Sequence, residues 1–114
     1  MMDNKELFNG ELKGTQRAGV MNLINYMEIS GFYTAPCSGA HHLAKEGGLL
    51  EHSLNVLDLA RKLNSAWGEP VNDTSLVIVC LLHDLGKMGD HGKPNYTPYI
   101  LKDGSQSTAK PYIT

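Results

Sequence analysis

The chain has 114 residues, and its ten Lys and Arg against twelve Asp and Glu give a formal net charge of −2 at pH 7. That length predicts a single domain with a core of moderate size. The balanced charge excludes the broad positive field with which proteins hold nucleic acid non-specifically, so an anionic substrate has to be held locally.

The cysteines and the apolar runs indicate the cellular compartment. Cys37 and Cys80 form no spaced disulfide framework, and Cys80 lies in an apolar run, where a small core residue is expected. The start of the sequence is polar and acidic, and every apolar run is far shorter than the roughly 18 residues that span a bilayer. We therefore expect a cytoplasmic protein that does not enter the membrane.

Two helices are predicted in the first third of the chain. Residues 3–13 carry a few apolar positions compatible with a short docking helix. Residues 16–30 predict an amphipathic helix, which Thr15 caps and Ser30 with Gly31 ends. The stretch 32–40 contains proline and glycine and is expected to connect helices.

A histidine pair and a glycine pair follow this connection. Gly47 and Gly48 weaken a helix by about 1 kcal/mol each relative to alanine, so they indicate a break or a close backbone approach. His41 and His42 precede them, which makes a functional turn plausible. For His41, an ordinary exposed loop histidine is an equal alternative.

Residues 49–66 predict the next helix, with apolar side chains in two adjacent rows. One row contains Leu50, Leu54, Leu57 and Arg61, and the other contains His52, Val56, Leu59 and Leu63. A lone histidine on such a row is usually a core residue, so His52 alone is a weak candidate ligand.

Seven consecutive apolar residues, 76–82, lead directly into His83 and Asp84. The capping cluster 72–75 and Gly86 favour a helix over 74–85, with a buried strand over 76–82 as the alternative. An element apolar on every side is expected to be buried on every side and to deliver both residues into the interior or to a cleft wall. Antiparallel packing against 49–66 would bring His52 to them. We expect this packing to bury Leu50, Leu54, Leu57, Val77, Cys80 and Leu81.

The remainder of the chain has no helical period. Residues 96–101 and 109–114 are prone to form strands, and Asp103-Gly104 between them is a turn dipeptide. A small β-hairpin is predicted, with Pro98 and Pro111 keeping it at an edge.

Two imidazoles and a carboxylate, from His52, His83 and Asp84, suit a divalent cation and leave positions open for water and substrate. Such a metal lowers the pKa of bound water toward ~7 and neutralises an ester oxygen, as phosphate-ester hydrolysis requires. Lys87 could reach a phosphate as a point charge. Its equal alternative is to complement the negative end of the helix.

Residues 47–54 (GGLLEHSL) and 81–87 (LLHDLGK) together resemble the HD domain of the metal-dependent phosphohydrolase superfamily. The His-His and GGLLEH pattern is similar to the HD domains of Gram-positive 3′-5′ exoribonucleases and of phage or prophage HD proteins. The resemblance covers about residues 40–90.

The resemblance implies a mainly α, HD-domain-like helical bundle, here followed by the small C-terminal β-hairpin. It implies a divalent metal (Mn, Fe, Zn, Ni, Co or Mg) held by His52, His83 and Asp84. Hydrolysis of a nucleotide or of a nucleic-acid end is the implied activity in the full-length form, as phosphomonoesterase or phosphodiesterase. The implied catalytic residues are His83, Asp84 and Lys87, and the implied substrate contacts are His41, His42 and Lys87.

The sequence departs from the family pattern at its end, where the family's last aspartate ligand has no match. Asp90, His91 and Asp103 are candidates by residue type alone. We therefore expect residues 1–114 to form one HD-like domain truncated on its C-terminal side, which could associate with a second copy. A non-enzymatic module that binds metal or nucleotide for regulation is the alternative function.

Overall fold

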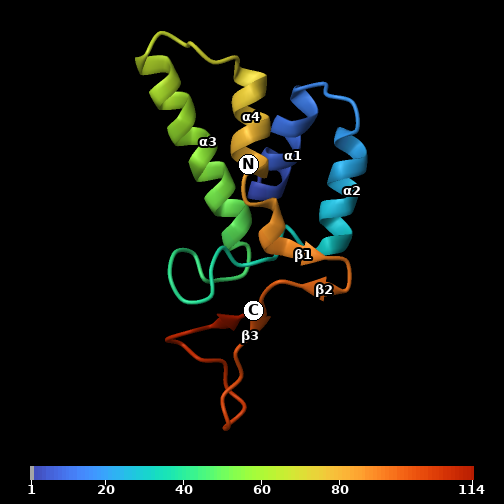
Figure 1. The fold of residues 1–114 in the computed structure, drawn as a ribbon, viewed down its shortest axis with the longest axis vertical. Coiled ribbons are helices and arrows are strands. Elements are labelled where there is room, and N and C mark those ends of the chain that lie inside the picture. The colour runs from blue at the N-terminus through green and yellow to red at the C-terminus, as the bar shows by residue number, and fades with distance from the viewer. Residues whose placement is uncertain (1) are drawn as a thin grey trace.

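The computed structural model describes residues 2–114, in which four α-helices stand side by side above a long loop and two small hairpins (Figure 1). The helices are α1 (Asn4–Gly14), α2 (Val20–Ser30), α3 (Gly48–Ala66) and α4 (Asp73–Leu82). α3 packs along α4, α1 packs against both, and α2 packs on α1. The predicted mainly α fold with a small C-terminal hairpin is confirmed.

Each helix begins at a residue suited to that position. Asp3 and Asn72 cap α1 and α4 through their side chains, whereas α2 and α3 follow Gly19 and Gly47, whose φ angles are 85° and 77°. The prediction that Thr15 caps the second helix is wrong. Its amide and hydroxyl both donate to the carbonyl of Leu12, so Thr15 ends α1 instead.

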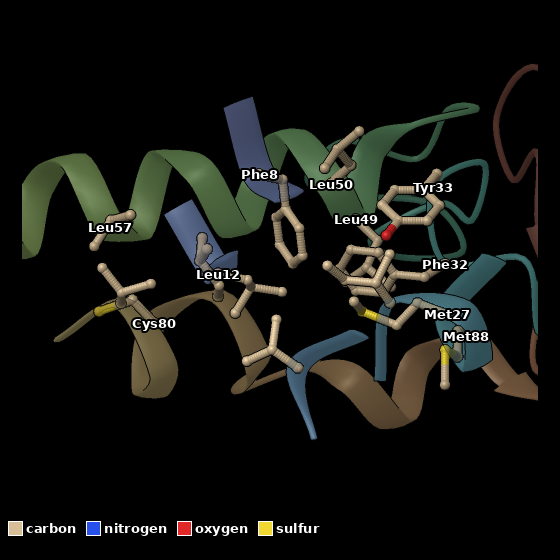
Figure 2. Packing of buried hydrophobic residues seen from close by; sticks show 14 residues of the cluster. Phe8, Leu12, Met27, Phe32, Tyr33, Leu49, Leu50, Leu57, Cys80 and Met88 are labelled. Atoms are coloured by element: carbon tan, nitrogen blue, oxygen red, sulfur yellow. The ribbon is translucent and has the colours of Figure 1, made fainter. Parts of the chain in front are cut away.

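The core lies between the helices, and aromatic residues pack at its end next to the loop (Figure 2). Phe8 of α1 meets Phe32 of the loop with ring centroids 5.0 Å apart, and Tyr33 meets both rings edge-on. Because Phe32 and Tyr33 are buried, the loop of residues 31–47 is anchored to the helices. Of the six positions predicted to be buried, five are, and Leu54 is partly buried.

The outer faces of α3 and α4 differ from the prediction. Val79 is 65% exposed, so α4 is not buried on every side. Leu59 and Leu63 are exposed as well, so the second row of α3 reaches the surface in its C-terminal half, whereas Val56 packs against the core. The segment 76–82 is helical rather than a strand, and α4 ends at Leu82, before the short 3₁₀ helix η1 (Leu85–Met88).

Two antiparallel strand pairs complete the chain. β1 (Gly89–Asp90) pairs with β2 (Lys93–Pro94), and β3 (Thr97–Pro98) pairs with β4 (Tyr112–Ile113). The predicted hairpin is present with shorter strands, and Asp103 shapes its turn by accepting from the Ser105 amide. The β1–β2 pair was not predicted. Among residues 2–114, no helix is long and apolar enough to cross a membrane.

Candidate metal centre

The start of α3 and the end of α4 bring His52, His83 and Asp84 together. The Nε2 atoms of the two histidines lie 3.2 Å apart. Asp84 Oδ2 lies 3.3 Å from Nε2 of His52 and 3.1 Å from Nε2 of His83. The antiparallel packing of α3 and α4 therefore produces the convergence that the sequence predicted.

The protonation of the imidazoles follows from their partners. Nδ1 of His83 lies 2.7 Å from the carbonyl oxygen of Cys80, which can only accept, so Nδ1 carries the proton and Nε2 presents a lone pair. Burial and the neighbouring His83 lower the pKa of His52, although Asp84 opposes them. The lowered pKa favours the neutral form of His52, which is the form that binds a metal.

The donor set fits a divalent cation. Bonds of about 2.0–2.1 Å place adjacent ligand atoms roughly 2.9 Å apart in an octahedron and roughly 3.4 Å apart in a tetrahedron. The three observed separations, 3.1–3.3 Å, lie between these values. Two facing lone pairs and a carboxylate oxygen at such distances repel one another unless a cation or a proton lies among them.

Lys87 lies beside this group and carries the nearest fixed positive charge. Its Nζ lies 3.5 Å from Asp84 Oδ2, and the side chain is about one-third exposed. Burial alone would lower the pKa of Lys87, but Cys37, Asp84 and Tyr96 together raise it. The ammonium therefore stays charged and can meet an anionic substrate.

The other predicted residues divide into near and distant ones. The His42 ring lies 5.2 Å from the His52 ring, whereas exposed His41 is fixed by its amide on Ser38 Oγ. The three candidates for the last family ligand do not join the centre. Asp90 accepts from Tyr26 and the amide of exposed His91, and Asp103 serves its own turn.

Cys37 is a member of the site that the sequence reasoning missed. Cys37, His52 and Asp84 offer ligand atoms that all lie within 4.8 Å of one another. Burial raises the pKa of the Cys37 thiol, and Lys87 partly opposes this effect. The sequence signal for its position was the glycine pair Gly47-Gly48. A Cβ on Gly48 would lie 3.1 Å from the amide nitrogen of Cys37, so glycine lets the Cys37 loop approach the start of α3.

Two surface hollows, of about 420 and 390 Å³, lie at the opposite end of the helices from this site. Donor chemistry, not volume, therefore marks the site. In comparison with known proteins, the family model described as the HD domain matches residues 49–109, more than half of the chain. Neither the comparison with curated proteins nor that with solved structures gave a match. The chain belongs to the HD domain family, and thereby to the metal-dependent phosphohydrolase superfamily.

Proposed function

We propose that this chain is a metal-dependent phosphohydrolase acting on a phosphate ester of a nucleotide or of a nucleic-acid end. The observation that carries the proposal is the convergence of His52, His83 and Asp84 within 3.3 Å of one another. When bound, the metal supplies charge neutralisation at the ester and a coordinated water with a pKa near ~7. From its His-His and GGLLEH pattern, we infer that the chain is similar to the HD domains of phage or prophage proteins and of Gram-positive 3′-5′ exoribonucleases.

The chain's own residues divide the remaining work. His52, His83 and Asp84 hold the cation, and the bond from His83 to the Cys80 carbonyl keeps that ring oriented. Lys87 neutralises a phosphate oxygen. Its ammonium lies beside Asp84 of the centre and stays partly exposed, so a bound phosphate can reach it. We accordingly assign the catalytic roles to His83, Asp84 and Lys87.

The substrate contacts lie around this centre. His42 is placed against His52, and His41 lies on the same loop, so both can meet a phosphate ester that approaches from solvent. A cavity of about 170 Å³ adjoins Lys87 and is lined in part by Tyr96 and Tyr112. The cavity is smaller than the roughly 300–1,000 Å³ of most ligand pockets, so it suits one part of a nucleotide, with aromatic side chains for a base beside a cation for its phosphate.

The alternative function is a non-enzymatic module that binds metal or nucleotide for regulation. It is favoured by the engagement of Asp90 and Asp103 in hydrogen bonds away from the centre, which leaves Asp84 as the carboxylate of the centre within residues 2–114. A cation held by few protein ligands keeps exchangeable water in its remaining positions, which weakens binding.

Metal content and turnover separate the two functions. We expect the purified chain to bind about one divalent ion and to release phosphate or a nucleotide from a nucleotide and oligonucleotide panel. Asp84→Asn and His83→Ala should lose both properties, whereas His91→Ala, which removes an exposed histidine outside the centre, should lose neither. Tight metal binding with no turnover would favour the module. Metal binding that survives Asp84→Asn unchanged would refute the site.

A further inference from the structure

Cys37 occupies an unusual position for a buried thiol. Its side chain is 3% exposed, yet Sγ lies 3.8 Å from the Lys87 ammonium, and it shares a 4.8 Å sphere with the ligand atoms of His52 and Asp84. The thiol therefore faces a polar, charged cluster. It is shielded from solvent without being surrounded by hydrocarbon.

The second cysteine shows what a packing thiol looks like in this chain. Cys80 is also buried, but it lies between α3 and α4 opposite Leu57, within the aliphatic part of the core (Figure 2). Apolar packing accounts fully for Cys80. It does not account for Cys37, because an alanine or a valine would satisfy packing and would not bring a soft donor to His52 and Asp84.

The backbone holds Cys37 in this position. Its amide donates to the carbonyl of Leu43 at 3.1 Å, and this carbonyl also accepts from Lys45 at 2.8 Å. The loop can close so tightly because Gly48 has no side chain; a Cβ there would lie 2.0 Å from the same carbonyl oxygen. Cys37 is thus fixed against the first turn of the helix that carries His52.

We propose that Cys37 is a protein ligand of the metal beside His52 and Asp84, a soft donor that favours thiophilic ions such as Zn²⁺, Co²⁺ or Fe²⁺ over Mg²⁺. The inference rests on the proposed function, since it concerns the same cation. On binding, the thiol loses its proton to solvent and the thiolate sulfur donates to the metal, so the divalent ion raises the net charge of the site by one instead of two.

The distances permit this with a movement of the Cys37 side chain. A Zn–S bond of about 2.3 Å and a Zn–N bond of about 2.1 Å place adjacent ligand atoms roughly 3.6 Å apart in a tetrahedron. The 4.8 Å bound on the group of three exceeds this by about 1 Å. Lys87 Nζ lies next to Sγ and would move aside when the metal binds. Its side chain is partly exposed, so it has room to turn toward substrate.

Cobalt spectroscopy of the full chain tests the proposal, because a thiolate ligand gives Co²⁺ a near-ultraviolet charge-transfer band that imidazole and carboxylate do not. We expect this band in the wild type and in Cys80→Ala, the matched control. Cys37→Ser should lose the band, keep the visible cobalt bands, and bind Zn²⁺ at least ~10-fold more weakly, since even outer contacts of a ligand are worth that much. Its affinity for Mg²⁺ should stay unchanged.

A second measurement guards against a folding defect in Cys37→Ser. In the Cys80→Ala background and in dilute urea, which opens the buried thiol to reagent, Zn²⁺ should slow the alkylation of Cys37, whereas Mg²⁺ should not. A charge-transfer band that persists in Cys37→Ser, or visible bands without a charge-transfer band in the wild type, would overturn the inference and leave the proposed function standing. Absence of any cobalt or zinc binding in the wild type would overturn both.

Discussion

Gly48→Ala perturbs the contact that joins the Cys37 loop to α3. The new Cβ would lie 2.0 Å from the Leu43 oxygen, whereas ordinary contact begins at 3.4 Å, so backbone must move by more than an ångström. That oxygen accepts from Cys37 and Lys45, and displacing it leaves one of these groups unsatisfied. A lost buried hydrogen bond costs about 1–3 kcal/mol, and overpacking adds a similar amount. We expect a loss of about 2–4 kcal/mol in the free energy of unfolding.

Two other glycines separate this steric effect from backbone strain and helix propensity. Gly47 has a φ of 77°, and its nearest neighbour to a Cβ would be 3.8 Å away, so Gly47→Ala should cost only the left-handed conformation, about 1 kcal/mol. Gly10 lies in α1 with open space around it, and Gly10→Ala should stabilise the protein by up to ~1 kcal/mol.

Urea unfolding of the three variants, with linear extrapolation to water, measures the differences. The order of stability should be Gly10→Ala, wild type, Gly47→Ala and then Gly48→Ala. Titration calorimetry should show that Gly48→Ala binds Zn²⁺ more weakly than the wild type, because the movement displaces Cys37 and the turn before His52. If Gly48→Ala is as stable as Gly47→Ala, the close approach is not the constraint we infer, and the reasoning fails.

Four further outcomes follow from the helix contacts. Arg61→Met should lower the free energy of unfolding by about 1 kcal/mol, since the guanidinium joins Glu11 and Asp73 in partly exposed pairs. Arg61 holds the pKa of Asp73 below its usual value, so the wild type should lose this contribution as the pH falls below about 4, and urea titrations of Arg61→Met should show a shallower acid dependence. Leu81→Ala should cost about 2–5 kcal/mol by thermal or urea unfolding, because this side chain is fully buried. Val79→Lys should change stability by under ~0.5 kcal/mol and reduce any self-association seen by analytical ultracentrifugation.

The sequence predicted the helices well where periodicity and caps agree, and less well where one residue type has two uses. Thr15 illustrates the second case, because a threonine can accept a bond at a helix start or donate to a carbonyl at a helix end. Only the position of Gly19, which starts α2 in a left-handed conformation, decides between them. Where one helix ends and the next begins depends on the path of the loop between them, and a local sequence pattern carries no information about that path.

Val79 shows a limit of the apolar pattern itself. A run without polar residues predicts burial, but it cannot say on how many sides another element will pack. α1 and α3 cover the face of α4 that carries Val77, Cys80 and Leu81, and they leave Val79 in solvent. The packing partners, which arise from tertiary contacts, decide the outcome.

The candidate site divides in the same way. His52, His83 and Asp84 could be predicted together because each lies at the end of a helix whose period and caps are local, and antiparallel packing then brings the ends together. Cys37 could not, because its place depends on the aromatic anchors of the loop and on the close approach at Gly48. A glycine pair indicates that another part of the backbone approaches closely, but it does not identify the approaching segment. A donor delivered by a loop therefore becomes visible only once the three-dimensional path of that loop is known.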